Sequence, residues 1–484
     1  MNITRNLFET AAHRPDTTFL VGPDEREWTY QAIAERALRF AGFLGERGIA
    51  PGDRVVLTFP NSVDYLVAYI GTLAHGAVAT LVDYRSVPKH VDFVRRDCGA
   101  RLWISPAERA DYSAVPDHVL FDEHAGAAPA DAAALDVTQP LALIMYTSGT
   151  TGTPKGVRLS HANLQHTQGA IRTWAAVEPG ERELTTLSLT HLFGLAHLHV
   201  HWSLGGTVIV DDSLRDVPRV LARMTEHQAT SFPGTPAGFK LILDRFADQF
   251  RAAAESLRYI IINSAPMDPA DVVRLRELVP HVRLYMYYGL TEASRSTAIH
   301  YNAHPDKLAS AGTATPGAEV CIGSPQERLV GETGEILVRG PHVTEGYWGA
   351  DSSDYFVDGW FRTGDLGRID EDGFVLWEGR VREQINVDGL KVSPLEVESV
   401  LRLHPRVRDC AVVGVPDPLS GQTVVAYVVV DGDWDRSLET EIRRFCKPHL
   451  EFYKIPRRLN RVEQIPRTDT GKVKRLSLLG EKPA

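Results

Sequence analysis

Apolar positions in the first two thirds of the chain alternate between two spacings. Residues 30–48 and 62–76 repeat apolar side chains every three or four positions, as amphipathic helices do, whereas 53–60 and 77–82 are short apolar runs typical of strands. The same alternation continues in later segments: 143–147, 161–176, 206–210 and 257–264. Alternating helices and strands pack as layers, so the sequence predicts an α/β fold.

The pattern changes toward the C-terminus. From about Gly331 the chain reads as short alternating strands with frequent glycines, and after Arg380 it reads as a compact set of two helices and two strands. We therefore expect a large multi-layer α/β domain over 1–379 and a small α+β lid domain over 380–484. A chain of 484 residues is longer than one hydrophobic core usually organises, which agrees with two domains.

Composition narrows the class of protein. The chain is 43% apolar and 24% charged with a net charge of −10, which argues against a general nucleic-acid binder. It contains no uninterrupted apolar run of about 18 residues, and its four cysteines are scattered without paired spacing. We expect a cytoplasmic protein that neither inserts into membranes nor binds nucleic acid.

A glycine- and hydroxyl-rich loop follows one predicted strand. The segment "YTSGTTGTPKG" (146–156) combines freed backbone N–H groups, hydroxyls and one lysine, a set that suits a chain of phosphates. Its glycines and Lys155 do not have the spacing of a Walker-type loop, which disfavours a P-loop kinase or GTPase.

This loop is similar to the signature loop of the adenylate-forming superfamily, which includes acyl- and aryl-CoA synthetases, adenylation domains of nonribosomal peptide synthetases and firefly luciferase. Further segments resemble the family's motifs in order and spacing: "SLTHLFGL" (188–195), "NSAPM" (263–267), "YYGLTE" (287–292), "GEILVRGPHVTEGYW" (334–348), "DGWFRTGDLGRIDEDG" (358–373), "GRVREQINVDGLKVSPLEVE" (379–398) and "IPRTDTGKVKR" (465–475). Together they span nearly the whole chain.

The resemblance implies ATP and Mg²⁺ as ligands and assigns residues to each part of the nucleotide. Tyr288 would stack on adenine, Asp365 would accept hydrogen bonds from both ribose hydroxyls, and Arg380 would contact the ribose. The signature loop would hold the phosphates through Thr147, Ser148, Gly149, Thr150, Thr151 and Lys155. Small residues would line the adenine base: Ser264, Ala265, Pro266 and Gly289.

The expected reaction brings one anion onto another. At 4 Å and an effective dielectric constant of 20, two unit charges repel by roughly 4 kcal/mol, so cations must offset the approach of a carboxylate to the α-phosphate. By the resemblance, Thr291 holds the α-phosphate and Glu292 ligates Mg²⁺, which prefers oxygen ligands. Lys472, near the C-terminus, matches the family lysine that bridges the carboxylate and the α-phosphate.

The acid pocket is expected beside these groups. Matching positions are His191, which we also count among the catalytic candidates, and a set of mostly small or apolar residues: Phe193, Gly194, Pro233, Gly234, Asn263 and Gly289. No aspartate for an α-amino group is evident, which favours a carboxylic acid over an α-amino acid. Arg295 either faces a second anionic group of the substrate or projects to solvent, and the sequence favours solvent because arginines are mostly exposed.

The histidine-rich segment after His191 raises a different possibility. His197 and His201 are an i, i+4 pair, which on a helix can bind zinc. No carboxylate or cysteine within the segment completes a ligand set, so we interpret these histidines as packing on a helix face or as exposed.

The small domain of the family rotates between two half-reactions. Arg382 stands at the expected hinge, and Gly389, Leu390 and Lys391 match the segment along the pantetheine tunnel. Asn386 and Asp388 replace lysines of several CoA-using relatives, which weakens the case for free CoA.

The sequence thus predicts a ligase that activates a carboxylic acid as its adenylate, releases pyrophosphate and acylates the thiol of CoA or of a phosphopantetheine carrier protein. Transfer to an amine is the alternative, a non-catalytic nucleotide- or acyl-binding protein is a remote one, and luciferase-type oxygenation is more remote.

Overall fold

The computed structural model describes residues 1–106, 117–131, 140–147, 154–326, 329–387, 390–417, 421–468, 471 and 473–479. Contacts divide the chain into two compact units, Met1–Val320 with Val338–Phe361 and Cys321–Leu337 with Arg362–Ala484. The small unit thus includes residues on both sides of 380, and the hinge expected there stays a prediction.

The large unit contains a mixed sheet with the strand order β15-β14-β13-β12-β11-β9-β10-β1-β2. Its central strands, from β1 through β13, pair in parallel, whereas β2, β14 and β15 are antiparallel to their neighbours. The strand bounds are β1 Thr18–Val21, β2 Glu27–Thr29, β9 Arg182–Thr185, β10 Thr207–Val210, β11 Ser231–Gly234, β12 Tyr259–Ile262, β13 Arg283–Leu290, β14 Ala293–His300 and β15 Thr313–Ala314.

A second sheet of this unit has the order β6-β5-β3-β4-β7-β8. All its pairs are parallel except that of β7 with β8, the two strands on either side of the central residues of the signature loop. The bounds are β3 Arg54–Leu57, β4 Val78–Leu81, β5 Leu102–Ser105, β6 His118–Leu120, β7 Leu141–Thr147 and β8 Lys155–Ser160.

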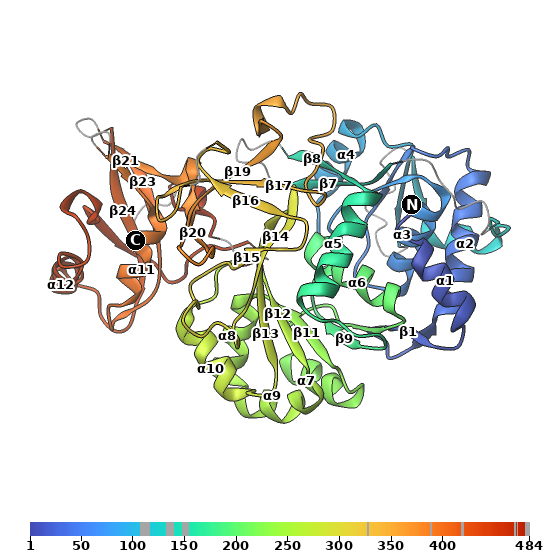
Figure 1. Cartoon of the computed structure of the whole chain (residues 1–484), viewed down its shortest axis with the longest axis horizontal. Helices are drawn as coiled ribbons and strands as arrows, with labels where there is room; N and C mark the ends of the chain where they lie inside the picture. The colour runs from blue at the N-terminus through green and yellow to red at the C-terminus, as the bar shows by residue number, and fades with distance from the viewer. Residues whose placement is uncertain are drawn as a thin grey trace. The chain divides into compact units, whose positions relative to one another are not determined.

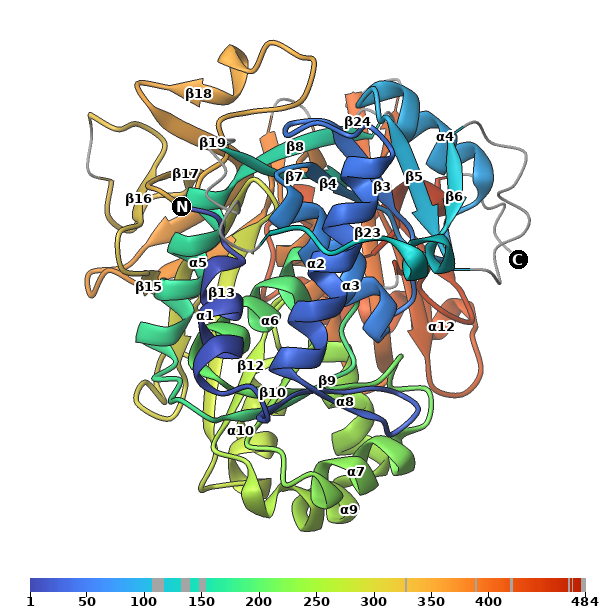
Figure 2. The same cartoon turned by 90° about the vertical axis from the view of Figure 1, so that its right-hand side faces the viewer.

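Helices of the large unit form layers against these sheets. Helices α2, α3, α5 and α6 lie between the two sheets, and α7 to α10 cover the other side of the first sheet (Figures 1 and 2). The bounds are α1 Arg5–His13, α2 Tyr30–Glu46, α3 Val63–His75, α4 Pro88–Asp97, α5 His161–Trp174, α6 Leu192–Leu204, α7 Val217–Glu226, α8 Pro236–Arg245, α9 Ala247–Ala253 and α10 Pro269–Leu278.

Two of the inner helices, α3 and α6, are buried nearly all round, as their apolar sequences dictate. Ser62 caps the first turn of α3 by accepting from the Tyr65 amide, and Gly76 ends it with a φ of 86°, in the left-handed region that favours glycine. Helix α6 ends in the same way at Gly205, with a φ of 65°. Apart from Phe193 and Ser203, every residue of α6 is buried, so its three histidines lie in the protein interior.

The small unit is an α+β structure with its own core. One sheet has the order β22-β21-β24-β23, with β25 on β24, and helices α11 and α12 pack with it around Val412, Val428 and Ile442. The bounds are β21 Ile385–Val387, β22 Leu390–Val392, β23 Val407–Asp417, β24 Gly421–Val430, β25 Arg458–Arg461, α11 Pro394–Arg402, α12 Arg436–Cys446 and α13 Arg475–Leu478.

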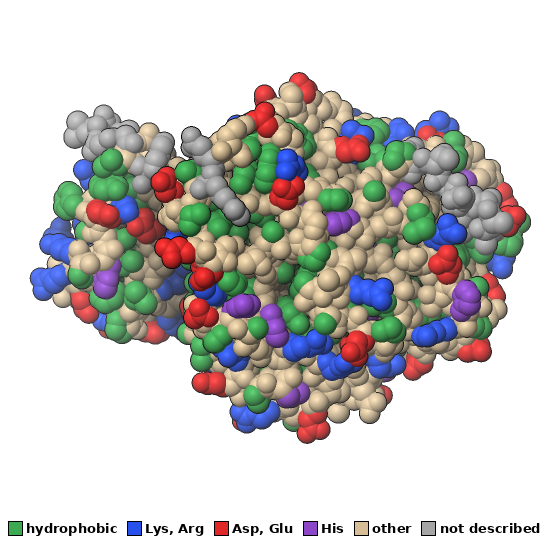
Figure 3. Space-filling view, in the orientation of Figure 1, with side chains coloured by type: hydrophobic (Ala, Val, Ile, Leu, Met, Phe, Trp, Pro, Cys, Tyr) green, Lys and Arg blue, Asp and Glu red, His purple; other side chains and the backbone are tan. Residues whose placement is uncertain are grey.

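A further sheet has the order β16-β17-β19-β18, with β20 on β19. Its bounds are β16 Glu319–Ile322, β17 Gly334–Arg339, β18 Phe356–Val357, β19 Trp360–Ile369 and β20 Val375–Arg380. Acidic and basic side chains are interspersed on the face of the large unit drawn in Figure 3. Within the described residues, no helix combines the length and apolar character needed to cross a membrane.

Candidate functional site

The predicted pocket residues meet at the carboxyl ends of three neighbouring parallel strands. Gly234 ends β11, Asn263 follows β12, and Tyr288 lies near the end of β13. The Asn263 amide donates to the Gly234 carbonyl at 3.3 Å, and its side chain donates to the Tyr287 carbonyl at 2.7 Å. Ligands of open α/β sheets bind at this edge, so the motif residues share one suitable location.

Close backbone approach explains the small residues of this edge. A Cβ on Gly289 would lie 2.5 Å from the Arg295 amide nitrogen, and one on Gly234 would lie 2.8 Å from the Phe239 ring. Ser264 has a φ of 90°, a strained conformation for a residue with a side chain. Pro233 is buried, Ala265 is half-buried and Pro266 is exposed.

Glu292 occupies the turn between β13 and β14. Its side chain is buried, and one carboxylate oxygen accepts a hydrogen bond of 2.8 Å from the Tyr347 hydroxyl. Its carbonyl accepts from the Thr344 amide at 2.7 Å, which fixes the turn. Thr291 beside it is half-buried. Tyr347 lies in a quoted motif, yet sequence reasoning gave it no role.

Two tyrosines connect this carboxylate to the signature loop. Thr147 and Lys155 pair across the base of the β7–β8 hairpin, while Ser148, Gly149, Thr150 and Thr151 lie outside the described residues. The Lys155 ammonium donates to the Tyr355 hydroxyl and lies 4.9 Å from the centre of that ring. The Tyr355 and Tyr347 rings are 4.7 Å apart, so Glu292, Tyr347, Tyr355 and Lys155 form a continuous row.

In the small unit, Asp365 and Arg380 face each other across strands β19 and β20. They are register partners, and Arg380 Nε lies 2.6 Å from Asp365 Oδ1. The carboxylate is buried, and the Asp365 amide donates to Thr363 Oγ1 at 3.0 Å. Leu390 is exposed, Gly389 and Lys472 lie outside the described residues, and the side chains of Arg382 and Lys391 are likewise not described.

The predicted acid pocket begins at the N-terminus of α6. His191 precedes the helix, is largely exposed, and has Nε2 4.0 Å from Asp83 Oδ2. Phe193 packs edge-to-face with Tyr287 and His197, with 5.5 Å between ring centres in both pairs. A Cβ on Gly194 would lie 2.8 Å from the Ser188 carbonyl, which explains the small residue there.

The expectation that Arg295 projects to solvent is wrong. Its side chain is only 1% exposed, and its two terminal nitrogens donate to the Leu192 and Phe193 carbonyls at 3.2 and 3.1 Å. The guanidinium also lies 4.5 Å from the centre of the Tyr287 ring. Strand β14 lies under helices α5 and α6, so a side chain on its covered face is buried whatever its polarity.

Helix α6 carries three buried histidines, and the charge of Arg295 acts on two of them, His197 and His199. Glu183 on β9 accepts from His197 Nδ1 at 2.9 Å and lies 3.2 Å from His201 Nε2, while His199 Nε2 is 2.9 Å from the Tyr69 hydroxyl. Burial opposes ionisation of Glu183, but the two histidines outweigh it and hold the pKa of this carboxyl below its usual value. No group of three or more His, Cys, Asp or Glu residues in the described part of the chain is arranged to hold a metal ion.

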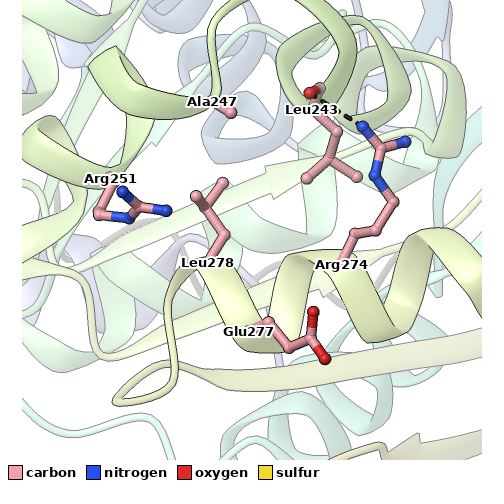
Figure 4. A pocket seen from close by; sticks show the side chains of 6 residues that line it. All are labelled: Leu243, Ala247, Arg251, Arg274, Glu277 and Leu278. Atoms are coloured by element: carbon pink, nitrogen blue, oxygen red, sulfur yellow. Dashed lines mark hydrogen bonds between the residues drawn. The ribbon is translucent and has the colours of Figure 1, made fainter.

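A separate small pocket lies between α8, α9 and α10. It has a volume of about 240 Å³ and is lined by Leu243, Ala247, Arg251, Arg274, Glu277 and Leu278 (Figure 4). Arg274 is already held by Asp244, Asp271 and the Leu243 carbonyl. None of the predicted site residues lines this pocket.

Comparison with known proteins now decides the family. Residues 7–348 match the model of the AMP-binding enzyme family, and residues 396–472 match that of the AMP-binding enzyme C-terminal domain. The chain belongs to the AMP-binding enzyme family. The resemblance drawn from the motifs is therefore confirmed.

Relatives of this AMP-binding enzyme cover most of its length. It is 32% identical to the feruloyl-CoA synthase of an Amycolatopsis species over 92% of both chains, and 30% identical to the oxalate–CoA ligase of Arabidopsis thaliana over 97% and 96% of the two chains. The solved structure of O-succinylbenzoate coenzyme A synthetase from Bacillus subtilis, in complex with AMP, superposes with a TM-score of 0.88 at 26% identity and covers 99% of this chain and 98% of that one. The predicted fold class is confirmed.

Proposed function

We propose that this AMP-binding enzyme activates a small carboxylic acid with Mg-ATP, releases pyrophosphate and transfers the acyl group to the thiol of CoA. The observation that carries the proposal is the row from Glu292 to Lys155, which links a buried carboxylate to the signature loop. The chain that contains it is similar to CoA ligases over 92% or more of its length. Those relatives favour CoA over a carrier protein or an amine, although Asn386 and Asp388 replace lysines.

Glu292 suits an Mg²⁺ ion. One of its oxygens is occupied by Tyr347, and the other takes no hydrogen bond from the described residues, so an oxygen ligand is left for a hard cation. The metal would neutralise phosphate charge when bound. Tyr347 would hold the carboxylate in one orientation, and Thr291 would donate its hydroxyl to the α-phosphate.

Lys155 would exchange its tyrosine partner for phosphate oxygens. Its ammonium now contacts only neutral groups among the described residues, the Tyr355 hydroxyl and the faces of the Tyr355 and Tyr347 rings. A polyphosphate is a stronger partner for a cation than a phenol is, so ATP would draw the lysine away. Pyrophosphate release would return it to Tyr355.

The small unit would supply the remaining groups. Asp365, already oriented by Arg380, would accept from the ribose hydroxyls, and Lys472 would neutralise the charge that gathers between the carboxylate and the α-phosphate. We expect Lys472→Ala to lower pyrophosphate exchange by about 10²–10³-fold, while consumption of a supplied acyl adenylate by CoA changes little. Equal loss in both assays of the folded variant would remove this role.

Pyrophosphate exchange across a panel of carboxylic acids tests the proposal, followed by separate addition of CoA, a pantetheinylated carrier protein and amines. Glu292→Gln should lower exchange by about 10²-fold or more, because an amide is a poor metal ligand. Glu345→Gln, on the same segment as Tyr347 but exposed, is the matched control and should leave exchange unchanged. Absence of exchange with every acid would overturn the proposal.

A further inference from the structure

Arg295 carries a charge that the described part of the chain does not pair. Its terminal nitrogens donate to two backbone carbonyls and to Ser294 Oγ, the last at 2.6 Å, while its buried Nε has no hydrogen-bond partner. Within 4.0 Å of the guanidinium there is no carboxylate among the described residues.

An arrangement of this kind is costly unless an anion completes it. A guanidinium stays protonated in proteins, so burial cannot be relieved by loss of the proton. Burial lowers the pKa of Arg295, and the Tyr287 hydroxyl and Glu183 offset the effect only in part. Glu183 lies beyond ion-pair distance of the guanidinium, and its own partners are His197, His201 and Ser231 at 2.9, 3.2 and 3.3 Å.

The arginine lies among the residues predicted to line the acid pocket. Its guanidinium donates to the Phe193 carbonyl and lies over the Tyr287 ring, and its backbone amide lies close to Gly289. The backbone carbonyl of Tyr287 in turn accepts a hydrogen bond from the Asn263 side chain. His197, which packs on Phe193, has its Nε2 buried without a partner. Two polar groups without partners therefore lie beside the same predicted pocket wall.

We propose that Arg295 binds a second carboxylate on the acid that this enzyme activates, so that the substrate is a dicarboxylic acid. The inference rests on the proposed function and deepens it. One carboxylate attacks the α-phosphate, while the other accepts from Arg295 Nε and a terminal nitrogen, which gives the guanidinium the anion it lacks. His197 Nε2 is the neighbouring group available for a further hydrogen bond.

A purely structural role is the competing explanation, because Arg295 also ties β14 to the first turn of α6. The two differ in substrate selection. A purely structural arginine influences the activation of all acids alike. An arginine that binds the second carboxylate makes the enzyme discriminate between a dicarboxylate and a neutral analogue of the same shape.

The test measures pyrophosphate exchange with matched pairs: short aliphatic and aromatic dicarboxylic acids, each against its half-amide, which has the same shape without the second charge. We expect the wild-type kcat/KM to favour the best diacid over its half-amide by at least about 10²-fold. Arg295→Met should reduce this ratio to below about 10, and Arg295→Lys, which keeps the charge, should restore part of it. Arg283→Met, a half-buried arginine over the Tyr259 and Tyr285 rings, is the control and should leave the ratio unchanged.

The wild-type ratio alone can refute the inference, so the result does not depend on the variants folding. Activation of half-amides or monoacids as well as diacids overturns it and leaves the proposed function standing. An unchanged ratio in folded Arg295→Met also overturns it, in favour of the purely structural role. No exchange with any acid overturns both proposals.

Discussion

Among the described residues of the large unit, two arginines are buried, Arg223 and Arg295, and their surroundings differ. Arg223 on α7 lies 3.1 Å from Asp211 and 2.9 Å from Glu25, and it donates to the Val210 and Gly22 carbonyls at 2.7 Å each. Arg295 on β14 makes backbone hydrogen bonds too, but no carboxylate of the described residues reaches it.

The difference indicates that Arg223 stabilises the fold, whereas Arg295 is available to bind a ligand. Both guanidiniums lose their hydration, yet only Arg223 recovers the lost free energy from fixed carboxylates. Its partners come from two separate segments of the chain, 22–25 and 210–211, and it ties both of them to α7. Arg295 has the same burial without that compensation, and it lies beside predicted pocket residues.

The largest effect is expected from Arg223→Met. Removal of Arg223 leaves the buried Asp211 carboxylate with only a longer ion pair, 3.8 Å to Arg219 Nε, so we expect the free energy of unfolding of the large unit to fall by about 3 kcal/mol. Urea unfolding measures this change. A loss below about 1 kcal/mol would mean that the carboxylates do not compensate Arg223 as the geometry indicates.

Arg295→Met should have a smaller effect on stability. It removes a charge without a carboxylate partner and replaces it with an apolar side chain of similar length, so the lost hydrogen bonds and the relieved desolvation oppose each other. We expect the free energy of unfolding to change by less than about 1.5 kcal/mol, in the same urea assay. A loss as large as that of Arg223→Met would erase the contrast between the two sites.

The surroundings of Arg295 should also make stability depend on pH, through the buried His199. Burial lowers the pKa of His199 from 6.5 to about 3, with Arg295 adding to the effect. Below pH 6.5 the unfolded chain takes up a proton that folded His199 does not, so its contribution to stability is complete above pH 6.5 and is lost as the pH falls toward 3.

His199→Phe checks this sign. Unfolding free energies measured from pH 7 to pH 5 should fall less steeply in the variant than in the wild type, by up to about 1.4 kcal/mol per pH unit. At pH 7 the variant should be slightly less stable, because the Tyr69 hydroxyl loses its partner. Parallel pH profiles would show that His199 does not titrate differently on folding.

The smallest effect is expected from Arg283→Met. Arg283 is half-buried over tyrosine rings with centroid distances of 5.7 and 6.0 Å, so part of its side chain stays in contact with solvent in the folded state. We expect a change of at most about 1 kcal/mol, the usual limit for a partly exposed cation–π contact. A larger loss of stability would mean that stacking on aromatic rings, rather than burial, decides how much each arginine contributes to stability.

Much of the fold and part of the candidate site could be predicted from sequence, because they depend on local pattern. The period of 30–48 predicts helix α2, and the run 53–60 contains strand β3. Glu292 and Lys155 were both found through motifs, since neighbouring residues carry their chemistry. Tyr347 and Tyr355 were given no role, because nothing local links them to residues some 55 and 200 positions away.

By itself the sequence determined the alternating elements, the family and the residue types of the nucleotide motifs, all of which are encoded within short stretches of chain. Only the tertiary structure decided which polar side chains are buried and whether they are paired. Positions 283 and 295 are both arginines on adjacent strands. Arg295 is buried under α6 whereas Arg283 is half-buried, because burial depends on the layer packed above a strand. Whether a buried charge has a partner is likewise a property of distant segments brought together, as Asp211, Glu25 and Arg223 illustrate.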